Sequence, residues 1–283
     1  MESVDIPPQW RLLERKMAKG VVLVIGGVDT GKSTLVRYLA GRLRLDRKVV
    51  WIDGDIGQTT TGPPTTQTLN IPEAGASYRP LARWFVGATS PSGHMLQTIT
   101  GLQRLVQKAI GWGAETILVD TTGFIAPNAG GLTLKWSKFE LLAPSIVVAL
   151  QKENELEPIL SPWRKCARFS IADVPVASMV KKSSASKRRA FRHSHFKHYF
   201  QQSRRVSLSV DNVGIVGRSP LQKRQLVGMI DRMGFLAALG IVEEMDRKEI
   251  VLRMPLTSTG EIDMLRAGSL MLDEDLNEIA IAR

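Results

Sequence analysis

The chain has 283 residues, of which 43% are hydrophobic, and a formal net charge of +11. This length and composition predict an ordinary folded core, in one large domain or in a main domain with a smaller one. The single cysteine, Cys166, excludes a disulfide framework within the chain and favours a reducing compartment. The N-terminus lacks the apolar core of a signal sequence and no apolar run reaches membrane-spanning length, so we expect a soluble cytoplasmic protein without a membrane partner.

The positive charge is concentrated in one stretch. Residues 181–205 hold nine Lys and Arg, three of the four histidines, and no Asp or Glu. Without this stretch the net charge falls from +11 to +2 (11 less 9). Such a basic patch attracts polyanions, and nucleic acid is the commonest of these. The alternative interpretation is a solvated or disordered loop.

In chain order, residues 1–20 form a lead-in with a short predicted helix, and residues 21–25 are a short apolar run typical of a buried parallel strand. Directly after this run comes G-x-x-x-x-G-K-[ST], the phosphate-binding loop pattern. Its glycines let backbone amides point at phosphate oxygens, Lys32 reaches the β- and γ-phosphates, and the Ser33 hydroxyl can bind Mg²⁺. A helix predicted over residues 35–45 points its N-terminus at the phosphates. The predicted nucleotide-binding residues are Gly26, Gly27, Asp29, Thr30, Gly31, Lys32, Ser33 and Thr34.

Acidic residues follow two later apolar runs. Residues 48–53 predict a second strand that leads into Asp53 and Asp55, which share one face because strand residues two apart do so. A pair of carboxylates here suits Mg²⁺ binding or proton abstraction, with a surface turn as the alternative. Asp120 closes the strand predicted over residues 116–120 and resembles the second acidic signature of phosphate-loop NTPases, acting on Mg²⁺ directly or through water.

The remaining pattern alternates strands and helices. We predict a polar loop at 59–68, a strand at 83–87, helices at 95–110, 132–142 and 156–167, and a strand at 145–150. This order indicates an α/β fold, a P-loop NTPase with a mainly parallel sheet flanked by helices. Beyond residue 205 we expect strands within 206–216, a helix at 221–233 and a hairpin of 237–244 with 249–254. The expected domains are therefore the lead-in 1–20, the P-loop domain 21–205 and a small α+β accessory domain 206–283.

Four motifs in order resemble the polynucleotide 5′-hydroxyl kinases, the family of the eukaryotic mRNA cleavage-factor kinase and the ribosomal-RNA-processing kinase. GGVDTGKST at 26–34 is similar to the family's phosphate loop, and DIGQ at 55–58 to its D-x-x-Q motif. TTGF at 121–124 resembles the T-x-G-W clasp, with Phe124 replacing Trp, and RRAFR at 188–192 resembles the R-x-x-x-R lid. The likeness covers about residues 20–205 and is closest to short prokaryotic members.

The resemblance implies transfer of the γ-phosphate of ATP or GTP, with Mg²⁺, to the 5′-hydroxyl of single-stranded RNA or DNA. It makes residues 181–205 a basic lid segment, and it implies a monomer with RNA-processing proteins as possible partners. The implied catalytic residues are Lys32, Asp55, Gln58, Arg188 and Arg192, and the implied metal ligands are Ser33, Asp55 and Asp120. The implied nucleic-acid contacts are Thr121, Thr122, Gly123, Phe124, His94, Lys187 and Arg189.

Some of these roles stay open at this point. Thr121 and Thr122 can hold the lysine or the incoming 5′ end. Phe124 can stack on the terminal base, worth about 1–3 kcal/mol and largely indifferent to sequence, or it can be a packed core residue. His94 can touch substrate phosphate or cap a helix.

Two other functions remain compatible with the motifs. The first is a nucleotide-dependent switch or maturation ATPase, although Ile25 occupies the position where its dimer-activated subgroup has a lysine. The second is an RNA-binding scaffold that keeps ATP as a structural ligand, against which the intact Lys32 and Asp55 argue.

Overall fold

The computed structural model describes residues 6–177, 183–217, 220–255 and 262–279, and these form two compact units. The first unit comprises the described residues of Met1–Asp55, Thr68–Leu81 and Pro91–Ser183. The second comprises those of Ile56–Gln67, Ala82–Ser90 and Ser184–Arg283. The helix that carries Arg188 and Arg192 therefore belongs to the second unit, which differs from the sequence-based boundary at residue 206.

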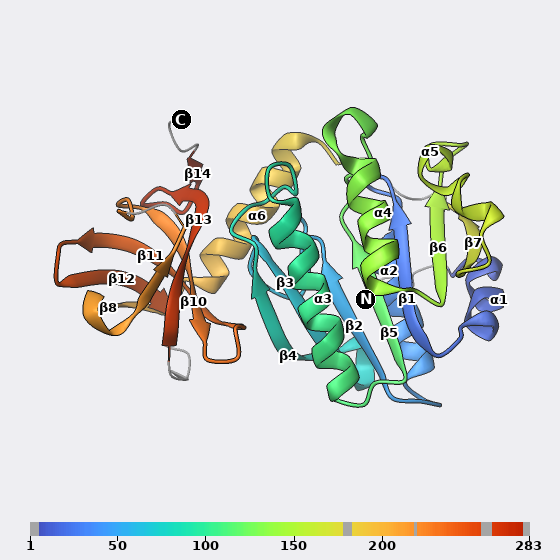
Figure 1. Cartoon of the computed structure of the whole chain (residues 1–283), viewed down its shortest axis with the longest axis horizontal. Helices are drawn as coiled ribbons and strands as arrows, with labels where there is room; N and C mark the ends of the chain where they lie inside the picture. Colours follow the sequence, from blue (N-terminus) through green and yellow to red (C-terminus); the bar gives the residue numbers. More distant parts are fainter. Residues whose placement is uncertain (1–5, 178–182, 218–219, 256–261, 280–283) are drawn as a thin grey trace. The chain divides into compact units, whose positions relative to one another are not determined.

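A seven-stranded sheet in the order β4-β3-β2-β5-β1-β6-β7 organises the first unit (Figure 1). The strands are β1 (Gly20–Gly26), β2 (Val49–Gly54), β3 (Thr66–Pro72), β4 (Tyr78–Phe85), β5 (Thr116–Thr121), β6 (Ile146–Gln151) and β7 (Ser170–Pro175). The five strands from β2 to β7 in this order are parallel, whereas β3 is antiparallel to β2. Parallel pairing places the carboxyl ends of β1, β2 and β5 at one edge of the sheet, as the α/β prediction requires.

Strand β3 was not predicted from the sequence. The polar loop expected at 59–68 overlaps its first residues, and its sequence, TQTLNIP, has only two large aliphatic side chains. The structure buries its polar residues as fully as its apolar ones. A threonine-rich strand suits a sheet because Thr is β-branched, but it lacks the apolar alternation by which strands are predicted.

Helices cover both faces of this sheet (Figure 1). They are α1 (Pro8–Lys16), α2 (Lys32–Leu43), α3 (Met95–Gly111), α4 (Gly131–Leu142) and the single turn α5 (Glu157–Leu160). Helices α1 and α2 bury Leu13 and Leu39 in one cluster with Val22 and Val24 of β1, while α3 and α4 pack together on the opposite face.

The helix predicted over 156–167 is wrong in length. Beyond α5 there is only a 3-10 turn, Trp163–Lys165. Pro162, which precedes this turn, lacks the amide hydrogen that a continuing helix needs.

The second unit combines one helix, α6 (Ala185–Tyr199), with a mainly antiparallel sheet ordered β14-β13-β10-β11-β12-β8, to which β9 adds alongside β13. Its strands are β8 (Ser203–Ser209), β9 (Gly214–Val216), β10 (Gln225–Asp231), β11 (Leu236–Met245), β12 (Glu249–Pro255), β13 (Ile262–Leu272) and β14 (Glu278–Ile279). The predicted hairpin is confirmed as β11 and β12. Phe196 and Phe200, at the end of α6, pack with Leu226 and Ile230 on one face of this sheet.

The helix predicted over 221–233 is wrong, because this stretch contains strand β10. Both faces of β10 are buried: Leu226 and Ile230 join one apolar cluster, and Val227 and Met229 join the other. A strand covered on both faces is a continuous apolar run, and periodicity alone cannot distinguish it from a buried helix. The described residues after 205 contain no α-helix, and the helix of the second unit is α6, which lies before the predicted boundary.

Among the described residues, no helix combines the length and apolar character needed to cross a membrane.

A substitution in α2 tests the packing of the first unit. Leu39 is fully buried in the cluster beneath β1, so Leu39→Ala should lower the free energy of unfolding by about 2–5 kcal/mol. Leu45, just past the end of α2, is 63% exposed, and Leu45→Ala should change stability by less than about 0.5 kcal/mol. Urea unfolding of both variants measures the difference. Equal losses would contradict the assigned core.

Candidate nucleotide and phosphoryl-transfer site

The phosphate loop occupies the turn between β1 and α2. Asp29 and Gly31 both have left-handed backbone conformations, with φ of 55° and 88°. These conformations curl the loop ahead of the N-terminus of α2, and a curled loop before a helix N-terminus is an arrangement that binds anions. Of the eight predicted nucleotide-binding residues, Gly26 ends β1 and the other seven lie in this loop and the first turn of α2. Their role in binding stays a prediction.

Lys32 is folded back over its own loop. Its Nζ donates to the carbonyl oxygen of Gly27 at 2.5 Å and lies 3.4 Å from Thr30 Oγ1. The Thr30 hydroxyl also donates to the Gly27 carbonyl oxygen, at 3.1 Å. The side chain is thus held across the concave side of the loop, where an ammonium can meet phosphate oxygens.

Two carboxylates are paired across neighbouring strands at the carboxyl edge of the sheet. Asp53 on β2 lies in register with Asp120 on β5, and both are almost completely buried. Asp55, one step beyond the end of β2, is half-buried, and its amide donates to Asp53 Oδ1 at 3.4 Å. The strand pattern therefore predicted the neighbourhood of these acids, and the register adds the pairing of Asp53 with Asp120.

Asp120 has the chemistry of a cation ligand. Among the described residues, neither of its carboxylate oxygens accepts a hydrogen bond within 3.5 Å, but the Ser33 hydroxyl lies close enough to lower its pKa. Burial, reinforced by the charge of Asp53 and opposed by Lys32, raises the pKa of Asp120 to about 7. A buried carboxylate beside the Ser33 hydroxyl and Asp55 suits Mg²⁺, which uses few protein ligands and completes its shell with water and phosphate. These donors therefore fit the predicted metal.

Two buried lysines of α4 belong to the same region and were missed from the sequence. Lys135 and Lys138 are both fully buried. Lys135 Nζ donates to Thr121 Oγ1 at 2.8 Å and to the Thr122 carbonyl oxygen at 2.7 Å, whereas Lys138 Nζ has no hydrogen-bond partner among the described residues. Burial lowers the pKa of Lys138 to about 8 against the opposing effects of Asp55 and Asp120, and burial also lowers that of Lys135.

The sequence contains a pattern from which these two buried lysines could have been identified. The buried positions of α4 follow helical spacing, and the lysines fall within the buried stripe formed by Gly131, Leu134, Lys135, Lys138, Phe139 and Leu142. A lysine on the apolar stripe of a helix breaks the usual pattern and marks a side chain that needs a buried partner.

The clasp, residues 121–124, lies directly against the phosphate loop. Thr121 and Thr122 are buried, and Phe124 is half-buried. A Cβ on Gly123 would lie 2.7 Å from the backbone nitrogen of Val28, so only glycine permits this approach. The lysine that Thr121 holds is Lys135 of α4.

The other predicted catalytic residues, Gln58, Arg188 and Arg192, lie in the second unit. Residues 185–199 form helix α6, so the two arginines, four residues apart, lie on one helical face. Gln58 Nε2 donates to the Gly57 carbonyl oxygen at 2.7 Å and lies 3.5 Å from the carbonyl oxygen of Arg188. Arg192 forms a two-pronged ion pair with Glu278 of β14, with 2.8 Å between Nη2 and Oε2. This pair was not predicted.

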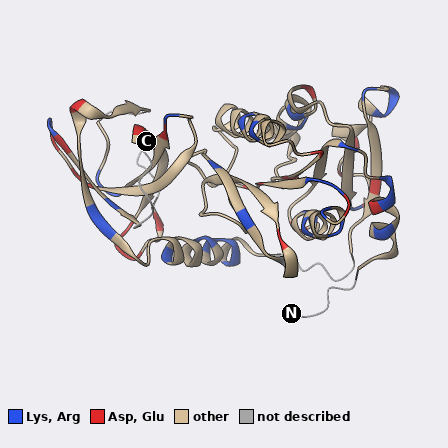
Figure 2. Cartoon of the chain, turned by 90° about the horizontal axis from the view of Figure 1, so that it is seen from below, with Lys and Arg blue, Asp and Glu red and all other residues tan. Residues whose placement is uncertain are grey.

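Helix α6 carries Lys and Arg along its length and no Asp or Glu (Figure 2). Lys187 and Arg189, the predicted nucleic-acid contacts, lie in its first turns, and the Ser184 hydroxyl caps its N-terminus by accepting from the Lys187 amide at 3.2 Å. The first two residues of the basic lid segment, Lys181 and Lys182, lie outside the described residues. His94 precedes α3, where its Nδ1 lies 3.2 Å from the Ser92 carbonyl oxygen.

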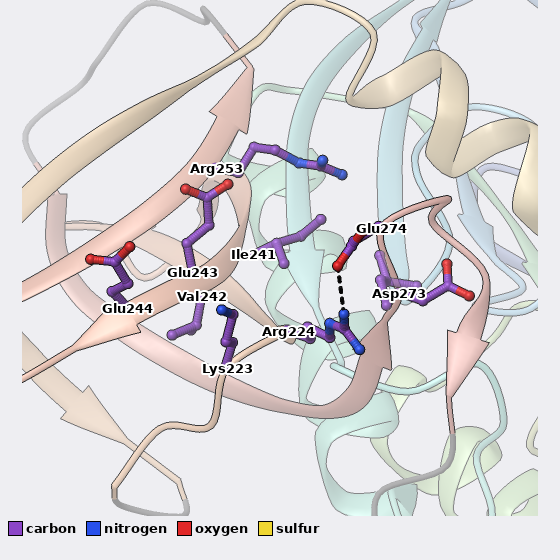
Figure 3. Close-up of a pocket in the computed structure, with 10 residues that line it drawn as sticks. Lys223, Arg224, Ile241, Val242, Glu243, Glu244, Arg253, Asp273 and Glu274 are labelled. Carbon is purple, nitrogen blue, oxygen red and sulfur yellow. Dashed lines mark hydrogen bonds and ion pairs between the residues drawn. The ribbon is translucent and has the colours of Figure 1, made fainter.

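A separate cavity of about 240 Å³ lies in the second unit (Figure 3). Three basic and four acidic side chains line it: Lys223, Arg224, Arg253, Glu243, Glu244, Asp273 and Glu274. Arg224 pairs with Glu274 at 2.7 Å within this wall (Figure 3). Because acids outnumber bases, this cavity does not favour a polyanion.

Comparison with known proteins places the chain in a family. The sequence profile described as mRNA cleavage and polyadenylation factor CLP1 P-loop matches residues 26–202. The chain belongs to the CLP1 P-loop family. This match covers the phosphate loop, both acidic strand ends, the clasp and α6, and it confirms the resemblance drawn from the four motifs.

Curated relatives of the chain carry a kinase name. A polyribonucleotide 5′-hydroxyl-kinase of Methanocaldococcus jannaschii is 35% identical over 211 residues, covering 73% of this chain and 57% of the relative. The protein of the same name from Pyrococcus horikoshii is also 35% identical over 211 residues, covering 72% and 56%. The chain thus spans little more than half the length of these relatives. One from Pyrococcus abyssi is 28% identical over 346 residues and is covered to 95%.

Solved structures agree on the fold. The structure of a complex of Clp1p with Pcf11p matches with a TM-score of 0.69 at 14% identity, covering 93% of this chain and 77% of the matched chain. At this identity the likeness shows the fold of the CLP1 P-loop family and its additional C-terminal sheet.

The raised pKa of Asp120 predicts a pH-dependent gain in stability for Asp120→Asn. The folded-state pKa, about 7, lies above the ordinary 3.8, so the carboxylate destabilises the folded protein increasingly as pH rises from 3.8 through 7. Without nucleotide and with EDTA present, Asp120→Asn should raise the Tm relative to the unsubstituted protein more at pH 8 than at pH 5.

An exposed aspartate provides the control for this measurement. Backbone amides of Lys248 and Glu249 lower the pKa of Asp246, so its carboxylate is ionised at both pH values. Asp246→Asn should therefore change the Tm equally at pH 5 and pH 8. A gain for Asp120→Asn that does not grow with pH would contradict the buried-carboxylate assignment.

Proposed function

We propose that the protein is a polynucleotide 5′-hydroxyl kinase, which transfers the γ-phosphate of ATP or GTP to the 5′-hydroxyl end of single-stranded RNA, with DNA as a possible second acceptor class. One observation carries this proposal. The phosphate loop with Lys32 and Ser33 lies at the same sheet edge as Asp55 and Asp120, in a chain of the CLP1 P-loop family. The kinase name of its relatives supports the same activity.

The different burial of Asp55 and Asp120 supports a different role for each carboxylate. Asp55 is half-buried at the end of its strand, whereas Asp120 is fully buried within the next one. Asp55 is therefore the carboxylate that an incoming hydroxyl can reach, where it orients the hydroxyl and accepts its proton. Asp120 with Ser33 would hold Mg²⁺, which neutralises charge on the phosphates when it is bound. Lys32 and the loop amides hold the β- and γ-phosphates.

The second unit supplies the nucleic-acid contacts in this proposal. The basic residues of α6, among them Lys187 and Arg189, attract the phosphate backbone regardless of sequence. Arg188 and Arg192 stabilise the charge that develops on the transferred phosphoryl group, with Gln58 positioned beside Arg188. Phe124 and the clasp hold the terminal nucleotide, and His94 contacts substrate phosphate.

The kinase reading is favoured over a switch ATPase and over an ATP-bound scaffold. Its relatives are named for phosphorylation of a polyribonucleotide end, and Ile25 replaces the lysine on which dimer-activated switch ATPases depend. We propose that the enzyme acts as a monomer in the cytoplasm, where its exposed Cys166 would remain reduced. RNA-processing proteins are its proposed partners.

The chemistry of the substrate end tests the function. A single-stranded RNA with a 5′-hydroxyl should gain one phosphate in the presence of ATP and Mg²⁺, since only this end presents the nucleophile. The same RNA with a 5′-phosphate should not react, and sequence should matter little. Mass spectrometry of the products reports the modified end. Lys32→Ala should abolish transfer while leaving the fold intact, and transfer to a small metabolite without any transfer to oligonucleotides would refute the assignment.

The ion pair of Arg192 with Glu278 allows a sharp test of the lid. Both variants Arg192→Ala and Glu278→Gln break the pair and should destabilise the second unit. Only Arg192→Ala removes the guanidinium, so it alone should lower kcat, by about 10²-fold or more. Steady-state kinetics and thermal unfolding of both variants separate the two effects. Equal losses of kcat would show that Arg192 has a structural role only.

A further inference from the structure

The buried amine of Lys135 donates its hydrogen bonds to the clasp. The side chain is fully buried, so its Nζ is shielded from solvent. Its two hydrogen bonds go to Thr121 Oγ1 and to the Thr122 carbonyl oxygen, at 2.8 and 2.7 Å. Burying an amine is costly unless such bonds compensate it. Packing alone would be served better by leucine or methionine at this position.

The contact continues beyond Lys135 to the strand that precedes the phosphate loop. Thr121 Oγ1, while it accepts from Lys135, donates to the Val24 carbonyl oxygen of β1 at 2.9 Å. Two residues later, Gly123 packs against the backbone of Val28 within the loop. The chain from Thr121 to Gly123 is therefore fixed by α4 on one side and by β1 and the phosphate loop on the other.

We propose that Lys135 is a positioning residue for phosphoryl transfer: it clamps the clasp in one conformation against the phosphate loop, and so sets the place of the 5′-terminal nucleotide relative to the γ-phosphate. The consequence for catalysis rests on the proposed kinase function, whereas the clamping itself does not. A residue that acts in this way affects the binding of the oligonucleotide end more than that of the nucleoside triphosphate, because the phosphate loop makes its own internal bonds through Lys32 and Thr30.

Lys138 provides a matched control on the same helix. It is a second fully buried lysine, one turn from Lys135, and its Nζ has no hydrogen-bond partner among the described residues. Lys135→Met and Lys138→Met each replace a buried amine by an uncharged chain of similar length. Only the first variant removes bonds to the clasp.

Amide hydrogen exchange tests the clamp without reference to activity. In Lys135→Met, the amides of residues 122–124 should exchange about tenfold faster than in the unsubstituted protein, because two hydrogen bonds that hold this segment are lost. Lys138→Met should leave the exchange of this segment unchanged. Unchanged exchange in Lys135→Met, or the same acceleration in both variants, would overturn the proposal.

Kinetics test the consequence for the reaction. Lys135→Met should raise the KM for a 5′-hydroxyl RNA about tenfold and change the KM for ATP less than twofold, whereas Lys138→Met should keep the ratio of the two KM values. An equal rise in both constants for Lys135→Met would overturn the positioning role. If the unsubstituted protein transfers no phosphate to RNA, the proposed function fails by itself, and the exchange measurement still decides the clamp.

A second variant tests the same hydrogen bond in case Lys135→Met does not fold. Thr121→Val removes the hydroxyl that accepts from Lys135 and keeps the shape of the side chain. It should accelerate exchange at residues 122–124 in the same direction as Lys135→Met, and the acceleration in the double variant should be smaller than the product of the two single effects, since both changes break the same Lys135–Thr121 hydrogen bond. Additive acceleration, or none in Thr121→Val, would contradict the clamp.

Discussion

Burial of opposite charges at one sheet edge is the interaction on which the candidate site depends. Three lysines and three carboxylates from four segments influence one another there: Lys32, Lys135, Lys138, Asp53, Asp55 and Asp120. Burying an isolated charged group costs several kcal/mol of folding free energy. Each of these groups therefore needs a charged or hydrogen-bonding partner, or becomes neutral through a pKa shift. Burial accordingly raises the pKa of Asp120 and lowers the pKa values of both α4 lysines. The buried carboxylate of Asp120, beside Ser33 and Asp55, leaves this balance open to a bound cation.

The parallel sheet explains why these groups meet. Strands β1, β2 and β5 end at the same edge, so the phosphate loop, Asp55 and the clasp follow three neighbouring strand ends. Helix α4 adds the component that no strand end supplies. Lys135 of α4 donates a hydrogen bond to Thr121 of the clasp, and the Thr121 hydroxyl donates in turn to the Val24 carbonyl oxygen of β1. The site is therefore held by hydrogen bonds from both the sheet and its covering helix.

The second unit has a different physical character. Its sheet is mainly antiparallel, and the end of α6 packs on it through Phe196 and Phe200. The rest of α6 carries a run of positive charge suited to a phosphate backbone of any sequence. The ion pair of Arg192 with Glu278 ties that charge to β14. An arginine proposed to act on a phosphoryl group thus has a carboxylate partner in the structure.

The sequence by itself determined the features that contiguous residues encode. A strand, a glycine-rich loop and a helix in direct succession specify the phosphate loop, and Asp55 and Asp120 are identified because each follows an apolar run. The hairpin of β11 and β12 was predictable for the same reason. Only the tertiary structure decided the features that depend on distant partners. Strand β3 is polar in sequence and β10 is apolar on both faces, so periodicity identified neither as a strand. Lys135 meets Thr121 across 14 residues and Arg192 meets Glu278 across 86, and no local pattern records such contacts, because the free energy of a buried amine or ion pair is set by what folding brings beside it.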